Sequence, residues 1–205
     1  MNNVTIRQRI LLSFAVIIAV MLLMGGLAMQ RLSVIESRED LLRRDSIPGL
    51  QFGGRMESEW YANYMVLQQL AFVDVAEIPR VEERLRAKRA VFDDVVHDYE
   101  NSITSTQDRA NLDVVKRGSA AFFALQPEVI RLSKTNREAL LQLRQMRLEP
   151  AFAQTEKALA QLIDYNYVNA VESGKDIDAA VSAAKIGIGI SFAGALVLAV
   201  LAGFY

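Results

Sequence analysis

The chain contains no cysteine, and His97 is the only histidine among its 205 residues. The absence of cysteine excludes a disulfide framework and a thiolate metal site. A single histidine, with no G-x-S-x-G, metal-ligand or phosphate-loop motif elsewhere, leaves no nucleophile with an activating base. We therefore expect a protein that is not an enzyme and that holds neither a cofactor nor a metal, and we expect His97 at the surface.

Proline is also rare, with 4 residues, and glycine is sparse outside the apolar ends of the chain, so the sequence favours long helices. The net charge of −1 excludes a nucleic-acid binder that relies on a basic surface. The hydrophobic share of 52% is too high for an ordinary soluble domain and too low for a multi-span transporter. These values fit a chain with a few apolar segments and one polar domain.

The apolar residues are concentrated in two runs, Ile10–Met29 and Ile186–Tyr205, each about 20 residues long, as a bilayer-spanning helix requires. All acidic residues lie between the two runs. We expect two transmembrane helices that flank one external domain. The expected division is a cytoplasmic N-terminus over residues 1–9, a first transmembrane helix over 10–30, an external domain over 31–185 and a second transmembrane helix over 186–205.

Two arginines, Arg7 and Arg9, precede the first apolar run, and by the positive-inside rule they place the N-terminus in the cytoplasm. A cleaved signal peptide is the alternative, because Gly26–Ala28 is a passable cleavage site. However, the apolar run is longer than the core of a signal peptide, which has about 7–15 residues. We therefore expect an uncleaved anchor.

The section between the runs has the pattern of four helical stretches. The first extends to about Asp74, with a kink expected at Pro48 and an interruption at Gly53–Gly54. The second begins near Arg80 and ends within 101–106, where Thr106 is the expected cap of the next helix. Apolar residues at spacings of 3 and 4 mark the stripes expected to be buried, with Met56, Trp60, Leu67 and Leu70 in the first stretch and Phe92, Val95 and Tyr99 in the second.

The third stretch is expected to bend at Pro127 and to end within Ser133–Asn136, and the fourth begins near Arg137 and continues into the second apolar run. No stretch shows the alternation of a strand. Short breaks between helices imply antiparallel neighbours. The sequence therefore predicts an all-α protein, an antiparallel up-down four-helix bundle between two transmembrane helices.

Three segments carry a resemblance to a known family: Ile6–Phe14, Ser46–Leu50 and the end of the fourth stretch, Leu162–Ala170. The chain resembles the four-helix-bundle sensor domain of methyl-accepting chemotaxis proteins over essentially its whole length. The resemblance implies a periplasmic ligand sensor of the bacterial inner membrane, usually a homodimer, whose fourth helix moves when ligand binds. It also implies that downstream cytoplasmic signalling proteins are reached through a C-terminal part that follows the second transmembrane helix.

The best-known amino-acid sensors of that family hold a carboxylate with arginines of the first helix, but Met56–Pro79 contains neither Arg nor Lys. The better candidates are Arg137 and Arg144, which share one face of the fourth helix and suit a carboxylate ligand. The alternative is a surface row balanced by Glu138 and Glu149. Arg147 follows Arg144 by three residues in the same row, and the weaker candidates are Arg131 and Lys134, near the tip of the third stretch.

Next to Trp60, the residues Tyr61, Asn63 and Tyr64 form a polar and aromatic group on the first helix. A buried Asn63 needs hydrogen-bond partners, so it either fixes the register of the core or lines a pocket. Aromatic residues on a bundle stripe belong to the core more often than to a binding site, Trp60 above all. With the two arginines, this group would suit a small organic acid, and the predicted ligand-binding residues are Arg137, Arg144, Tyr61, Asn63 and Tyr64.

Small residues recur at a spacing of four in the second apolar run, as Gly187 with Ser191 and Gly189 with Ala193. Such pairs allow close contact between helices in lipid, within the chain or in a homodimer. The alternative is the ordinary glycine and alanine content of a spanning helix. The pattern is therefore compatible with a contact that slides, but does not require one.

Three functions remain open from the sequence. The first is the input module of a chemoreceptor, which binds a small-molecule ligand, expected to be a carboxylate. The second is the same module on a histidine kinase or a diguanylate cyclase. The third is a membrane protein that docks a partner without any small ligand, which a fully apolar core with all arginines paired would favour. None of the three involves nucleic acid.

Overall fold

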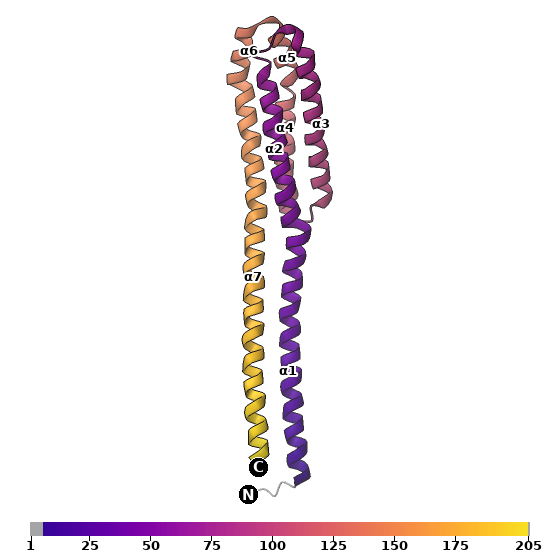
Figure 1. Cartoon of the computed structure of the whole chain (residues 1–205), viewed down its shortest axis with the longest axis vertical. Coiled ribbons are helices and arrows are strands. Elements are labelled where there is room, and N and C mark those ends of the chain that lie inside the picture. The colour runs from indigo at the N-terminus through magenta and orange to yellow at the C-terminus, as the bar shows by residue number, and fades with distance from the viewer. Residues whose placement is uncertain (1–5, 205) are drawn as a thin grey trace. The chain divides into compact units, whose positions relative to one another are not determined.

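The computed structural model describes residues 6–204, and almost all of them are helical (Figure 1). No strand occurs within that range, which confirms the predicted all-α class. The α-helices are α1 (Ile6–Leu41), α2 (Ile47–Gln69), α3 (Ile78–Ser102), α4 (Thr106–Phe123), α5 (Gln126–Thr135), α6 (Arg137–Leu143) and α7 (Glu149–Phe204), and η1 (Leu42–Ser46) and η3 (Arg144–Leu148) are π-helical segments, while η2 (Val75–Glu77) is a 3₁₀ turn.

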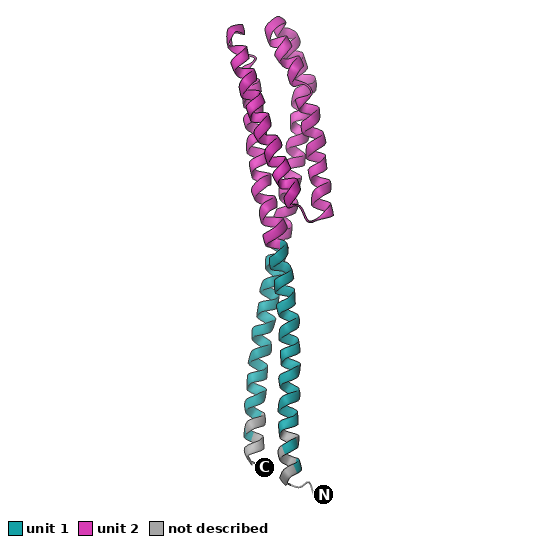
Figure 2. Cartoon of the chain, turned by 90° about the vertical axis from the view of Figure 1, so that its right-hand side faces the viewer, with its two compact units in different colours: residues 1–41, 171–205 teal, residues 42–170 magenta. Residues whose placement is uncertain are grey.

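The chain divides into two compact units, which Figure 2 shows in different colours. Unit 2, Leu42–Ala170, is a four-helix bundle in which α2, α3, α4 and the first part of α7 lie alongside one another (Figure 1). The short helices α5 and α6 follow α4 in the chain, contact each other, and lead through η3 into α7 (Figure 1). Unit 1 consists of residues 1–41 and 171–205 and therefore holds α1 and the second part of α7.

The buried stripes of the bundle follow from the helical period. In α2 the side chains of Met56, Trp60 and Leu67 are buried, and in α3 those of Phe92 and Tyr99 are buried. These residues were expected on the two stripes from their spacing, so the faces of both helices are confirmed.

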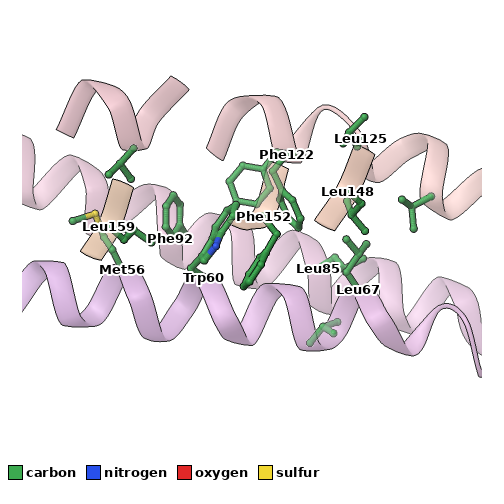
Figure 3. Close-up of a cluster of buried hydrophobic side chains, with 14 of the residues drawn as sticks. Met56, Trp60, Leu67, Leu85, Phe92, Phe122, Leu125, Leu148, Phe152 and Leu159 are labelled. Atoms are coloured by element: carbon green, nitrogen blue, oxygen red, sulfur yellow. The ribbon is translucent and has the colours of Figure 1, made fainter. Parts of the chain in front are cut away.

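Aromatic rings fill the middle of this core (Figure 3). Trp60 is fully buried and stacks on Phe152 of α7, with ring centroids 5.4 Å apart, and it meets Phe122 of α4 at 4.6 Å. Phe92 of α3 lies 5.7 Å from the same tryptophan. Each aromatic side chain buries about 150–250 Å², so one residue of α2 joins all four helices.

Two prolines explain the π-helical segments. Pro48 lies two residues after the end of η1, and Pro150 lies two residues after the end of η3. Proline removes a backbone donor and its ring collides with the carbonyl four residues earlier, which a wider π turn relieves without ending the helix. The irregularity expected at Pro48 is therefore present, and it takes the form of a π turn that ends two residues before the proline.

Three local expectations were wrong. Pro127 does not bend a helix, because α4 ends at Phe123 and a new helix begins at Gln126, with the proline in its first turn, where no donor is needed. Gly53–Gly54 does not interrupt α2; Gly53 packs against Ile163 of α7, where a Cβ would lie 2.7 Å from a side-chain atom. The cap of α4 is Ser105 rather than Thr106, since its hydroxyl accepts the N–H of Asp108 at 3.2 Å.

Unit 1 contains two segments that are long and apolar enough to cross a membrane. Their large apolar side chains are exposed, for example Leu22 in α1 and Phe192 in α7, both at 72%. No atom of the described residues lies within 4 Å of a Cβ built on Gly187 or Gly189. The small residues of the second run are thus open on that side, as a contact with another helix would require.

Candidate functional site

The predicted aromatic group of α2 separates into three environments. Asn63 is fully buried, and its side-chain oxygen accepts a hydrogen bond of 2.7 Å from the amide of Gln126 in α5. Tyr64 is half-buried and stacks on Phe152, with ring centroids 4.0 Å apart. Asn63 is therefore a polar group of the core that links two helices, and Tyr64 belongs to the aromatic cluster.

Tyr61 is 41% exposed, and its hydroxyl donates a hydrogen bond to the carboxylate of Glu156 in α7. That hydrogen bond, with the negative charge of the same carboxylate, raises the pKa of Tyr61. The three residues Tyr61, Asn63 and Tyr64 thus point to different surroundings. The larger cavities described below are not lined by any of them.

The two predicted arginines also have partners within the bundle. Arg137 donates to the carbonyl of Ala71 at 2.5 Å. Arg144 is partly buried and contacts Glu149 and Gln68, each at 3.2 Å. The cavity beside Arg144 has a volume of about 10 Å³, about the space of one water molecule. The assignment of the five residues to ligand binding stays a prediction, and in this conformation the space beside Arg144 is filled.

A concave surface of the bundle lies between α3 and α5, and we call it the basic groove. Its cavity volume is about 530 Å³. Basic residues line both of its sides, and its floor is apolar. The basic groove is lined by Glu82, Leu85, Arg86 and Arg89 of α3, by Phe123 at the end of α4, and by Gln126, Pro127, Ile130, Arg131, Lys134 and Thr135 of α5.

The cations of the basic groove are unequally neutralised. Lys134 pairs with Glu82 at 2.6 Å, and Arg89 lies 3.5 Å from Asp93 while its guanidinium covers the ring of Phe123 at 4.8 Å. The side chain of Arg131 makes no hydrogen bond or ion pair with any residue from 6 to 204. One guanidinium therefore faces the groove with all its donors open.

A neighbouring hollow on the α3–α4 face gives a contrast. It measures about 280 Å³ and includes His97, which is exposed as expected and bonds to Asn101 at 3.2 Å. Two cations line it: Arg89 pairs with Asp93 at 3.5 Å, and Lys116 pairs with Glu100 at 3.0 Å, a hydrogen bond that lowers the pKa of Glu100. The cations of this second hollow are therefore paired with carboxylates, whereas Arg131 of the basic groove is not.

At the end of unit 2 where the chain enters and leaves it, the core is polar instead of aromatic. Tyr99 of α3 donates a hydrogen bond of 2.5 Å to Asp108 of α4, and the amide of Asn166 of α7 donates to Asp108 at 3.1 Å and to the Tyr99 hydroxyl at 2.9 Å. All three side chains are buried. We call this set, with Asp45 of η1, the polar end.

The carboxylates of the polar end have only neutral hydrogen-bond partners among those the structure records. Burial raises the pKa of Asp108, and the charge of Asp45 acts in the same direction, while the hydrogen bonds from Tyr99 and Asn166 oppose it. Asp45 accepts two bonds from Thr104, at 2.9 and 3.2 Å, through one oxygen. Its other oxygen is buried without a partner, as is the side-chain oxygen of Asn166.

Gly49 allows α2 to approach α7 at this level. A Cβ built on Gly49 would overlap the side-chain amide of Asn166. Only glycine leaves room for the backbone to come this close. The position of Asn166 is thus fixed by a steric contact on one side and by three hydrogen-bond acceptors on the other, including the carbonyl of Leu162 at 3.0 Å.

Comparison with known families decides what kind of module this bundle is. A family model described as a four helix bundle sensory module for signal transduction matches residues 3–181. The chain belongs to this family. A comparison with curated proteins finds no match.

The family match confirms the predicted sensor-domain resemblance and the four-helix bundle. It covers α1, the basic groove and the polar end of the sensory module. The family is a sensory module of signal transduction and not a catalytic domain. The functional question is therefore what the module senses and how it passes the signal on.

Sequence reasoning identified only half of the basic groove. Arg131 and Lys134 were weak candidates, while Arg86 and Arg89 were not singled out. Both pairs have a spacing of three, which places each pair on one helix face. Two such pairs of basic residues on neighbouring antiparallel helices were the sequence signal that could have identified the basic groove. For the polar end, the signal was a tyrosine on the buried stripe, because the hydroxyl of a buried Tyr99 needs a partner.

Proposed function

We propose that this sensory module is the input part of a transmembrane receptor in the bacterial inner membrane, with its bundle in the periplasm. The observation that carries the proposal is that one helix, α7, belongs both to the bundle and to an apolar segment long enough to span a membrane. In α7, Leu159 and Leu162 are fully buried in the bundle, while Ile186 and Phe192 expose 63% and 72% of their side chains in an apolar segment. An unbroken helix transfers a displacement of its bundle part along its hydrogen-bonded backbone.

The signal in this proposal is a small shift of α7 against the rest of the bundle. A ligand needs only to prefer one of two helix arrangements for binding to move the equilibrium. The polar end would make such a shift discrete, because the hydrogen bonds of Asn166 fit this register of α7 and would be lost at others. Helix shifts of about 1–2 Å are typical of such switches.

The proposed stimulus is a small organic acid, and the proposed partners are a second copy of the chain and cytoplasmic signalling proteins. The surface of α2 and the turn after it support a homodimer, since Met65 is 65% exposed and Phe72 is 76% exposed, with Tyr61 on the same side. The predicted boundaries of the external domain, 31–185, extend beyond the compact unit 42–170 at both ends. They belong to this proposal as well.

Two alternatives differ from it in the output or in the absence of a small ligand. The same module can control a histidine kinase or a diguanylate cyclase instead of a chemoreceptor, and the proposed input chemistry is then unchanged. A docking protein without a ligand would have all its arginines paired. Because Arg131 has an open guanidinium in the basic groove, the observation favours a module that binds an anion.

The absence of cysteine makes the orientation directly testable. We would introduce a single cysteine at the exposed Glu138 of α6, or at Asn3 near the N-terminus, and treat intact cells with a membrane-impermeant maleimide. Cells with Glu138→Cys are expected to be labelled at once. Cells with Asn3→Cys are expected to be labelled only after the inner membrane is permeabilised, and the reverse pattern would contradict the proposal.

A further inference from the structure

The basic groove has more positive charge than the bundle itself neutralises. Of its five charged lining residues, four are cations, namely Arg86 and Arg89 from α3 and Arg131 and Lys134 from α5, and only Glu82 is an anion. The cations stand on two helices that face each other across the groove. Like charges held opposite one another repel unless an anion lies between them.

Several cations elsewhere in the bundle have carboxylate partners. Lys88 pairs with Glu59 and Lys116 with Glu100, each at 3.0 Å. Arg147 likewise contacts a glutamate of α5. In the basic groove, by contrast, the side chain of Arg131 has no partner among residues 6–204, and Arg86 contacts only the carbonyl of Glu82 in its own helix, at 3.5 Å. Two arginines with open donors, Arg86 and Arg131, therefore line the same concave surface.

We propose that the basic groove is a binding site for a small organic anion with an apolar body, such as an aromatic or branched carboxylate. A guanidinium presents a planar fork of donors that matches a carboxylate. The groove supplies two open forks from opposite sides, Arg86 and Arg131. The proposal rests on the sensory function above and gives that function a site different from Arg137 and Arg144.

The floor of the groove selects for the apolar body. Leu85 and Phe123 have exposures of only 2% and 4%, and Ile130 is half-buried beside them. A bare inorganic anion would leave this surface in contact with water. The volume of about 530 Å³ lies within the range of about 300–1,000 Å³ that small-molecule sites occupy. Because the charges line a concave groove instead of a flat face, the geometry fits a small molecule better than an acidic protein.

Gln126 connects the groove to the core. It lines the groove, and its amide donates to Asn63, the buried polar group of α2. An anion that draws α3 and α5 together acts on Gln126, and through it on α2. The groove is therefore linked by direct contacts to the helix that approaches α7 at Gly49.

The test measures anion binding to the full chain in detergent micelles by calorimetry and by thermal shift, since a ligand that binds only the folded state raises the melting temperature. The probes are benzoate, 3-methylbutanoate, succinate, inorganic phosphate and a short poly-glutamate peptide. Benzoate and 3-methylbutanoate are expected to bind. Arg131→Gln is expected to weaken this binding at least about tenfold, in line with the loss of a hydrogen bond to a charged group, and to leave the melting temperature of the free protein unchanged, because Arg131 is exposed.

The matched control is Arg117→Gln, an exposed arginine of α4 outside the groove, which is expected to bind benzoate within about twofold of the wild-type affinity. Arg86→Gln provides a second test from the opposite side of the groove and should also weaken binding. Three results would overturn the proposal: phosphate stabilising the chain as much as benzoate, the peptide binding more tightly than either, or binding lost in Arg144→Gln and kept in Arg131→Gln.

Failure of the groove and failure of the sensory proposal are separable. Reversed cysteine labelling would contradict the orientation of the receptor and leave benzoate binding intact. Correct labelling with no organic anion bound would overturn the groove and the organic-acid stimulus, and leave the orientation of the transmembrane receptor in place.

Discussion

The core of the bundle differs between its middle and its polar end. In the middle, Trp60, Phe122 and Phe152 pack ring against ring. At the polar end, the interior of the bundle is occupied by Tyr99, Asp108 and Asn166, which are joined by hydrogen bonds. Both regions connect α7 to α3 and α4, and both are buried.

The two kinds of contact respond differently when one helix shifts against another. Apolar contact is non-directional and scales with the area removed from water, so it changes little when one helix shifts slightly. Hydrogen bonds need donor–acceptor distances of about 2.7–3.2 Å and good alignment, so a shift of α7 by one residue, about 1.5 Å, breaks those of Asn166. We infer that the aromatic middle holds the bundle together and that the polar end fixes the register of α7.

The largest effect is expected from Trp60→Ala. Removal of a fully buried aromatic side chain that touches three other helices should lower the free energy of unfolding by about 3–5 kcal/mol. Met65→Ala, in the same helix but 65% exposed, should change it by less than about 0.5 kcal/mol. Urea unfolding of the bundle followed by circular dichroism measures both, and equal effects would contradict the aromatic middle as the main source of stability.

A smaller loss is expected from Gly49→Ala, because the new methyl group overlaps the amide of Asn166. Overpacking of this kind costs about 1–3 kcal/mol. Gly54→Ala is the matched control in the same helix, where a Cβ meets nothing within 4 Å. It should stabilise α2 by up to about 1 kcal/mol through helix propensity. Stabilisation by both substitutions would show that α2 and α7 are not in close contact at Gly49.

The helices of the bundle also show which features the sequence can predict and which it cannot. The spacing of Trp60 and Leu67 predicted which face of α2 is buried, since the helical period alone determines a face. It could not predict that Arg86 faces Arg131, because that depends on the register between two helices. The same applies to Asn166 and Gly49, which are 117 positions apart in the sequence and meet only through the packing of α2 on α7.

Local breaks were also only partly predictable. A proline indicates that a regular helix is disturbed, but not how. Pro48 follows a π turn inside a continuous helical segment, whereas Pro127 starts a new helix after a turn. Tyr61 and Tyr64 similarly differ in burial because three residues turn a helix by less than one full turn.

The polar end predicts a pH dependence of stability. Because the pKa of Asp108 is raised in the folded state, its protonated form is favoured by folding, so its contribution is complete below the unfolded pKa of about 3.9 and is lost as the pH rises through the folded pKa. Relative to Asp108→Asn, the wild type should therefore gain stability as the pH falls from 7 towards 4. Urea unfolding of both proteins across this range tests the sign, and a wild type that loses stability relative to the variant on acidification would contradict it.

The smallest effect is expected from Lys88→Ala, which removes the ion pair with Glu59 at the surface. Both side chains are partly exposed, at 39% and 22%, so solvent screens the pair, and exposed pairs contribute about 0.2–1 kcal/mol. The same unfolding measurement should show a loss in that range, which falls further at high salt. A loss as large as that of Gly49→Ala would mean that surface charge, and not core packing, determines the stability of the bundle.

The most direct measurement of the central claim, that anion binding shifts α7 against α2, uses the cysteine-free background of the full chain. Spin labels on cysteines at the exposed positions Gly54 of α2 and Gln161 of α7 report the distance between the two helices by pulsed electron paramagnetic resonance. On addition of saturating benzoate the distance distribution is expected to shift by about 1–2 Å, and Arg131→Gln is expected to abolish the shift. An unchanged distribution in the wild type, at a benzoate concentration that raises its melting temperature, would contradict the account.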